Sequence, residues 1–137
     1  MEPVKRVLVV DDEKSVRFLL SEVLNNHGFE VSVARDGQES LDKLEKGCFD
    51  LVVTDIHMPR LDGIAMLREM KWRGRNEKII VMTGDPSDQR LLCDDIPNLV
   101  TSLFKPFGME TFLKVVRSAT AGGVDRVGDG TGREVAL

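Results

Sequence analysis

Five short runs of aliphatic, mostly β-branched residues alternate with amphipathic segments, and this alternation restricts the fold more than any other feature of the chain. Strands that alternate with helices form a parallel sheet, and the helices then cover both of its faces. An uninterrupted apolar run such as Arg6–Val10 fits this arrangement, because both faces of such a strand are buried. We therefore expect an α/β fold with a doubly wound sheet of five parallel strands and helices on both faces. The expected strands are Arg6–Val10, Val31–Ala34, Asp50–Thr54, Lys78–Thr83 and Val100–Phe104.

Helical spacing and capping residues mark the segments between these strands. Apolar residues recur at helical spacing from Val16 to Leu24, and Gly28 is expected to end that helix. Asp36 and Glu39 have the spacing of a capping box, in which both side chains accept from backbone N–H groups at the helix start. The predicted helices cover residues 15–27, 37–46, 63–73, 87–95, where the pattern is weak, and 108–119.

The composition is typical of one globular domain, since 42% of the 137 residues are hydrophobic and 31% are charged. Residues 121–137 differ, because they hold five of the twelve glycines and no aromatic residue. Glycine has no side chain to bury and loses much backbone entropy on folding. We expect a folded domain over residues 1–120 and a flexible, glycine-rich C-terminal tail over residues 121–137, which is too short for an effector domain.

Charge and hydropathy exclude several classes of protein. The net charge of −4 argues against direct binding of nucleic acid, because nucleic-acid-binding domains usually carry a basic face. No apolar run approaches the roughly 20 residues of a membrane-spanning helix, and the first residues do not form a signal peptide. We expect a cytoplasmic protein without membrane insertion. Cys48 and Cys93 are expected to be buried or half-buried, and Trp72 is expected to serve packing rather than a site.

Chemically distinctive side chains stand at the ends of four of the predicted strands. Asp11 and Asp12 follow the first strand, Asp55 follows the third, Thr83 ends the fourth and Lys105 follows the fifth. Functional sites in such sheets lie outside the carboxyl ends of the strands, so these side chains should converge at one edge. Each residue alone is common in a turn or at a helix start, and only the joint pattern indicates a site.

Three carboxylates gathered at one edge repel one another. Two unit charges about 4 Å apart cost about 4 kcal/mol at an effective dielectric constant of 20, and a cation among them relieves this cost. Oxygen ligands that leave part of the shell to water favour Mg²⁺, with Mn²⁺ as an alternative. A divalent cation beside a carboxylate is used in phosphoryl transfer, where the carboxylate can be the nucleophile. Lys105 could then pair with one phosphoryl oxygen, and Thr83 could donate a hydrogen bond to another.

Together these motifs resemble those of response-regulator receiver domains, the CheY-like family with a flavodoxin-like fold. The resemblance covers about residues 4–120 and is carried by the segments Val7–Glu13, Leu51–Pro59, Leu61–Gly63, Val81–Gly84 and Phe104–Phe107. It implies that Asp55 accepts a phosphoryl group from a phosphohistidine on a sensor histidine kinase or a histidine phosphotransfer protein. It also implies a signalling protein that catalyses only its own phosphorylation and dephosphorylation. Such a protein would act on a downstream protein target, as a monomer or a weak dimer.

The resemblance further implies a set of metal ligands. Asp11 and Asp12 match the acidic pair that holds Mg²⁺, with Asp12 as a direct ligand and Asp11 acting partly through water. Asp55 itself and the backbone carbonyl of His57 complete the protein ligands.

Switch residues and departures from the family pattern follow from the same alignment of motifs. Thr83 matches the hydroxyl that moves toward the phosphoryl group on activation, and Lys105 matches the ion-pairing lysine. The family usually keeps an aromatic residue three positions before this lysine, where this chain has Ser102. His57 and Asp85 lie beside the site and are expected to tune the lifetime of the phosphoryl group, with a solvated polar loop as the alternative.

Two other functions stay open. A receiver-like binding module that does not respond to phosphate is one, and the absence of an aromatic residue at Ser102 favours it. A small Mg²⁺-dependent phosphatase with Asp55 as nucleophile is the other. Phosphatases of the haloacid-dehalogenase type carry a second aspartate two positions on, however, where this chain has His57. We favour the phosphorylatable, single-domain receiver, because the acids, Thr83 and Lys105 are all present.

Overall fold

The computed structural model describes residues 3–58, 60–85 and 98–121, and strands and helices alternate as predicted from residue 6 to residue 83. Every bound lies within one residue of its predicted position. The predicted helix over 87–95, Cys93 and the tail after Ala121 lie outside the described residues. The elements are β1 (Arg6–Val10), α1 (Lys14–Asn26), β2 (Glu30–Ala34), α2 (Gly37–Lys46), β3 (Leu51–Asp55), α3 (Gly63–Trp72), β4 (Lys78–Thr83), β5 (Leu99–Phe104) and α5 (Met109–Thr120).

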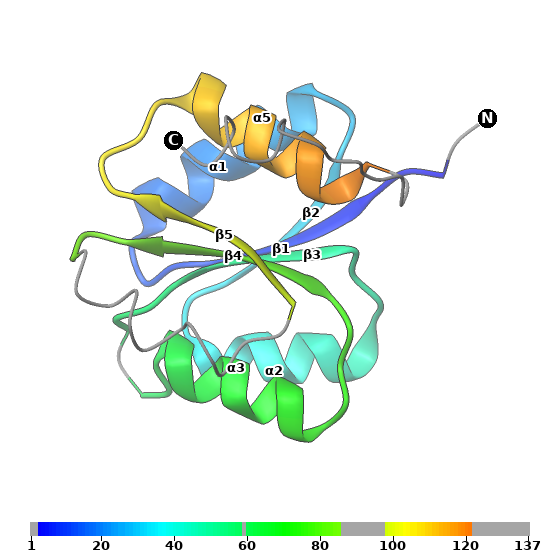
Figure 1. Cartoon of the computed structure of the whole chain (residues 1–137), viewed down its shortest axis with the longest axis vertical. Coiled ribbons are helices and arrows are strands. Elements are labelled where there is room, and N and C mark those ends of the chain that lie inside the picture. Colours follow the sequence, from blue (N-terminus) through cyan, green and yellow to red (C-terminus); the bar gives the residue numbers. More distant parts are fainter. Residues whose placement is uncertain (1–2, 59, 86–97, 122–137) are drawn as a thin grey trace.

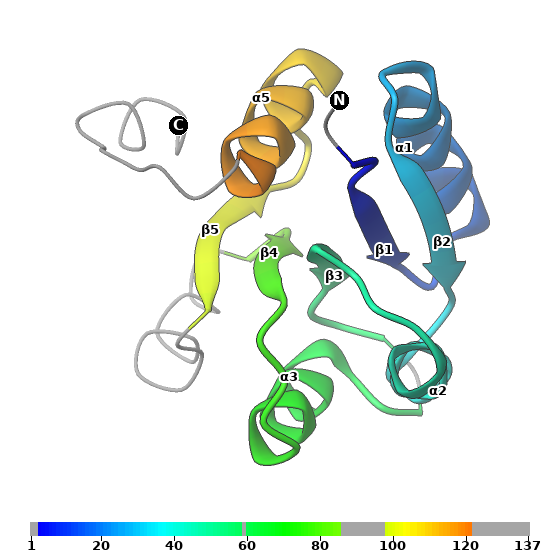
Figure 2. The same cartoon turned by 90° about the vertical axis from the view of Figure 1, so that its right-hand side faces the viewer.

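The five strands form one parallel sheet in the order β2-β1-β3-β4-β5, which confirms the doubly wound α/β prediction. Helices α1 and α5 cover one face, and α2 and α3 cover the other (Figures 1 and 2). The strand order reverses between β1 and β3, which are neighbours in the sheet. In such sheets, the crevice at this reversal is where ligands bind. Among the described helices, none has the length and apolar character needed to cross a membrane.

Side chains of β1 alternate between two apolar layers, one on each face of the sheet. Leu8 and Val10 belong to the layer under α2 and α3, which also contains Met66. Val7 and Val9 belong to the layer under α1 and α5. All four β1 side chains are fully buried. The continuous apolar run therefore exists because a strand in the middle of a covered sheet has no solvent-facing side.

Local side-chain caps begin α2 and α3. The Asp36 Oδ1 accepts from the Glu39 backbone N–H at 2.9 Å, and the Glu39 Oε1 accepts from the Arg35 N–H at 2.7 Å. The predicted capping box is thus present, although Glu39 reaches the residue before the cap rather than the cap itself. Asp62 caps α3 by accepting from the Ala65 N–H at 2.9 Å.

Two residues are more exposed than predicted. Trp72 does not pack against the core: it is 86% exposed at the last position of α3. The buried positions of this helix include Met66, Leu67 and Met70, and helical spacing turns position 72 away from that stripe. Cys48 is also exposed, because it lies in the connection between α2 and β3 and not in an element.

Candidate functional site

Three aspartates meet at the carboxyl edge of the sheet. Asp55 is the last residue of β3, and Asp11 and Asp12 directly follow β1, the neighbouring strand. One carboxylate oxygen from each lies within 4.8 Å of those of the other two. Asp11 and Asp55 are buried, whereas Asp12 is exposed. The site therefore has a buried floor and one acidic group at its open side.

Lys105 places a cation among these carboxylates. Its Nζ lies 3.0 Å from the Asp11 Oδ2 and 3.4 Å from the Asp55 Oδ2. Pairing of β4 with β5 sets its position, because the Lys105 backbone N–H donates to the Thr83 carbonyl at 2.8 Å. The following bond, Lys105–Pro106, is cis.

Asp11 is held from several sides. Its Oδ1 accepts from the Glu13 backbone N–H at 2.9 Å, and its Oδ2 accepts from the Lys105 Nζ at 3.0 Å. Its backbone carbonyl accepts from the Arg17 Nη1 at 2.7 Å. Both carboxylate oxygens and the carbonyl therefore have partners, so the orientation of this fully buried side chain is fixed.

Asp55 is fixed by the close approach of α3. Its Oδ1 accepts from the Ile56 N–H at 2.9 Å, and the Gly63 N–H donates to the Ile56 carbonyl at 2.7 Å. A Cβ at position 63 would lie 2.2 Å from the Asp55 carbonyl oxygen, so only glycine fits there. The first residue of α3 is thus in contact with the backbone that carries the Asp55 carboxylate.

Burial and neighbouring charge shift the protonation of two groups. Burial raises the pKa of Asp55 above its ordinary value, and the negative charge of Asp11 adds to this, while Lys105 acts in the opposite direction. For Lys105, burial alone would lower the pKa, but its hydrogen bonds and attraction to Asp11 and Asp55 outweigh burial and raise it. The lysine is therefore cationic at neutral pH. Its positive charge does not fully offset the cost of burying the ionised Asp55 carboxylate.

Three more predicted residues lie around this cluster. Asp55 pairs in register with Met82, so Thr83 comes one position further along the neighbouring strand. The Thr83 Oγ1 accepts from the Asp85 N–H at 3.0 Å and is 3.2 Å from the Asp85 carbonyl oxygen. The side chains of His57 and Asp85 are exposed in the loops after β3 and β4.

Ser102 lies in β5, where it pairs with Val81 of β4. It is 8% exposed. The pairing of β4 with β5 shifts register between Ile79 and Ile80, which pair with Leu99 and Thr101, respectively. Ser102 is therefore buried in the row of the sheet that also holds Val81 and Thr54, one position before the row of Asp55.

Arg60 and Arg17 are site-supporting residues that the sequence did not single out. Arg60 lies in the loop between β3 and α3, where its Nε is 3.0 Å from the Oδ2 of the buried Asp36. Its φ of +67° is in the left-handed region. Gly37 donates to the Leu61 carbonyl at 2.9 Å, so this loop is attached to the β2–α2 turn at two adjacent points. Neither arginine belongs to a sequence motif or a periodic pattern. The contacts of Arg60 with Asp36 and of Arg17 with the Asp11 carbonyl exist only in the folded chain.

The donor set fits a small divalent cation. Three carboxylates and one ammonium carry a formal charge of −2, which a divalent cation would neutralise. The available donors are oxygens, which Mg²⁺ prefers, and the exposed side at Asp12 leaves room for water ligands. The residues present therefore fit a small divalent cation such as Mg²⁺, which Asp11, Asp12 and Asp55 would hold.

Fold and site together define a receiver domain, and comparison with known proteins agrees. The family model of the response regulator receiver domain matches residues 7–117, so the chain belongs to this family. The chain is 36% identical over 113 residues to response regulator MprA of Mycolicibacterium vanbaalenii, an alignment that covers 82% of this chain and 49% of the relative. The chain thus spans about half the length of the curated relatives it matches.

Solved receiver structures have the same fold. The chemotaxis response regulator CheY4 of Vibrio cholerae superimposes with a TM-score of 0.77 at 30% identity, covering 85% of this chain and 99% of that one. The response regulator TrrA of Thermotoga maritima, solved in complex with Mg²⁺-BeF, gives 0.76 at 33% identity with the same coverage. The chain is therefore a receiver domain of the kind used in two-component signalling.

Proposed function

We propose that this receiver is switched by phosphorylation of Asp55, in a Mg²⁺-dependent reaction with a phosphohistidine. The phosphodonor would be a sensor histidine kinase or a histidine phosphotransfer protein. The observation that carries the proposal is the position of the Asp55 carboxylate, buried among two further carboxylates with the Lys105 Nζ at 3.4 Å. A carboxylate held in this way could act as a nucleophile beside two sources of positive charge, Lys105 and the divalent cation that the site would hold.

Asp11, Asp12, Asp55 and the backbone carbonyl of His57 would hold the cation, Mg²⁺ or alternatively Mn²⁺. When bound, the cation neutralises negative charge that spreads over the transferring phosphoryl oxygens. The fixed orientation of Asp11, whose Oδ1 accepts from the Glu13 N–H and whose carbonyl accepts from Arg17, supports this role.

The transfer step exchanges one phosphorus bond for another. An Asp55 carboxylate oxygen attacks the phosphorus of the phosphohistidine, and the P–N bond breaks with its electron pair returning to the imidazole nitrogen. The product is an acyl phosphate on Asp55. Lys105 can pair with a phosphoryl oxygen, because its ammonium already lies between Asp11 and Asp55.

Thr83 would couple the negative charge of the phosphoryl group on Asp55 to a conformational change. Its hydroxyl is held by the backbone of Asp85 and would leave this partner to donate to a phosphoryl oxygen. That movement would shift the end of β4 and the loop after it. Position 102 holds a buried serine, so no aromatic side chain there could move together with the Thr83 hydroxyl. The conformational response to phosphorylation would therefore be carried by the loops. His57 and Asp85, exposed beside the site, would set how readily water reaches the acyl phosphate.

Output would pass through contact with a downstream protein rather than through DNA binding or turnover of an external substrate. We place this domain at residues 1–120, with the protein as a monomer or weak dimer in the cytoplasm.

Incubation with Mg²⁺ and a small phosphodonor, followed by intact mass spectrometry, tests the proposal. We expect the mass of one phosphoryl group on the wild type and none on Asp55→Asn or in the presence of a chelator. An unmodified wild type, or equal labelling of Asp55→Asn, would contradict it. Steady turnover of a phosphate ester by the wild type would indicate the phosphatase alternative instead.

A further inference from the structure

A cationic surface with an exposed tryptophan lies at the C-terminal end of α3, on an element whose first residue contacts the phosphorylation site. Trp72 is the chain's only tryptophan and the most exposed of the large hydrophobic residues that the structure describes, at 86%. Arg68 lies one helical turn before it on the same side of the helix. Tryptophan and arginine are the residues most enriched among those that dominate binding energy at protein interfaces. We call the surface of Arg68, Lys71, Trp72, Arg73 and Lys78 the α3 end surface.

The charge of this region is opposite to that of the chain. Residues 68–78 hold five cationic and two acidic side chains, a net charge of +3 in a chain whose net charge is −4. Both acids are engaged locally: Glu69 pairs with Arg73 at 2.9 Å, and Glu77 pairs with Arg75. Lys71 and Lys78 are exposed. The region therefore presents positive charge around Trp72.

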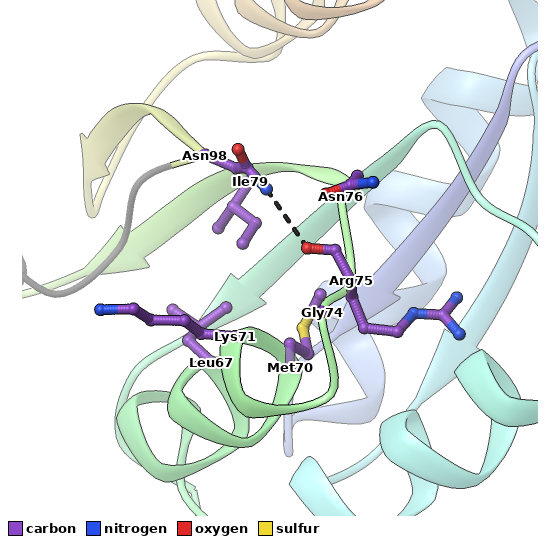
Figure 3. A pocket seen from close by; sticks show the side chains of 8 residues that line it. All are labelled: Leu67, Met70, Lys71, Gly74, Arg75, Asn76, Ile79 and Asn98. Carbon is purple, nitrogen blue, oxygen red and sulfur yellow. Dashed lines mark hydrogen bonds between the residues drawn. The ribbon is translucent and has the colours of Figure 1, made fainter.

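The cations are spread over an extended area instead of converging on a point. Figure 3 shows Lys71 on α3 and Arg75 in the following turn pointing in opposite directions from a hollow of about 210 Å³. Apolar side chains of Leu67, Met70 and Ile79 line this hollow, and the Asn98 Nδ2 donates to the Arg75 carbonyl at 3.4 Å beside it. Arg73 and Lys78 line a second hollow together with the acidic side chains of Asp50 and Glu77. Because Arg73 and Arg75 are paired with Glu69 and Glu77, Lys71 beside the first hollow and Lys78 beside the second carry exposed charge at separate places. This spacing suits an extended ligand with several negative charges, not a single small anion.

We propose that the α3 end surface binds an acidic segment of a partner protein that places an apolar side chain on Trp72. A protein segment fits better than nucleic acid, since double-stranded DNA carries a negative charge about every 1.7 Å of its axis and would also face the acidic remainder of the molecule. The interaction does not require phosphorylation, because it uses none of the residues at the carboxylate cluster.

Trp72 reports on its own contact, because the chain has no other tryptophan and no tyrosine. The probe is a synthetic amphipathic peptide with glutamates and leucines at helical spacing, titrated into the full chain at low ionic strength. We expect a blue shift of the tryptophan emission that saturates, and weaker binding as salt is added. A matched peptide with lysines in place of the glutamates should give no shift. No shift with the acidic peptide, or an equal shift with the basic one, would overturn the proposal.

Variants distinguish specific binding at the α3 end surface from nonspecific binding of the peptide elsewhere on the chain. With a fluorescently labelled acidic peptide, Trp72→Ala and the charge reversal Lys71→Glu should each weaken binding by about tenfold or more. Phe18→Ala removes another exposed aromatic residue, 66% exposed on α1 on the other face of the sheet, and should leave binding unchanged. Equal affinity of Trp72→Ala and wild type would refute the assignment. Tighter binding of a single-stranded oligonucleotide than of the acidic peptide would refute the choice of a protein partner.

Discussion

Substitution of Gly63 by alanine should destabilise the fold and disturb the proposed phosphorylation site together. The added Cβ would lie 2.2 Å from the Asp55 carbonyl oxygen, 2.9 Å from the Ile56 Cα and 3.1 Å from the Asp55 carbonyl carbon. All three are backbone atoms at the end of β3, so no side chain can turn aside. Overpacking costs about 1–3 kcal/mol, and this contact belongs at the upper end, at about 3 kcal/mol. Alanine regains about 1 kcal/mol through helix preference and lower unfolded-state entropy, leaving a net loss of about 2 kcal/mol.

Urea unfolding followed by far-UV circular dichroism measures this loss, with Gly47→Ala as the matched control. A Cβ at position 47 would lie 3.6 Å from the nearest atom, the Arg6 Nη1, in ordinary contact. The φ of Gly47 is −151°, which any residue adopts, so the control should change the free energy of unfolding by less than about 0.5 kcal/mol. Equal stability of the two variants would refute the close packing of α3 on Asp55. Calorimetric titration should also show weaker Mg²⁺ binding by Gly63→Ala than by Gly47→Ala.

Three further predictions follow from the site and its supports. In the presence of a chelator, Asp55→Asn should raise the free energy of unfolding at neutral pH. Because the pKa of Asp55 is raised on folding, the folded state keeps a proton that the unfolded state loses above about pH 3.8, so wild-type stability declines as the pH rises from there through the folded-state pKa. Urea titrations at several pH values should show a shallower decline in the variant. Arg60→Gly and Arg60→Ala both remove the ion pair with Asp36, but glycine adopts the φ of +67° without strain and should leave the protein about 1 kcal/mol more stable than alanine does; equal urea midpoints would contradict this. Mg²⁺ at 100 times its dissociation constant should stabilise the wild type by about 2.7 kcal/mol, visible as a higher melting temperature that a chelator reverses, whereas Asp12→Asn should show a smaller rise at the same concentration.

The order of strands and helices could be predicted because each element is specified locally. The apolar run of β1 shows that both of its faces are buried, and Asp36 with Glu39 marks the start of α2 within four residues of sequence. The gathering of Asp11, Asp55 and Lys105 could be predicted for a related reason. Parallel strands bring their carboxyl ends to one edge, so residues far apart in sequence share a location once the sheet is known.

Features that depend on contact between elements could not be read in this way. The pairing of Arg60 with Asp36 joins two loops whose distance only the packed sheet determines. The register shift in β5 leaves no pattern in a six-residue strand. For Trp72, a signal was present, because helical spacing from Met66 and Met70 turns position 72 outward. The prediction that Trp72 packs was wrong, because its phase on the helix, and not its apolar character, decides its exposure.

The central claim is that Asp55 carries the phosphoryl group, and locating the modification within the chain tests it most directly. Borohydride reduces an acyl phosphate of aspartate to homoserine, so the protein is phosphorylated with a small phosphodonor and Mg²⁺, reduced, digested and sequenced by tandem mass spectrometry. We predict homoserine at position 55 and at no other aspartate, including Asp11 and Asp12 of the same cluster. Homoserine at either of those positions, or none in a protein whose intact mass shows phosphorylation, would contradict the account.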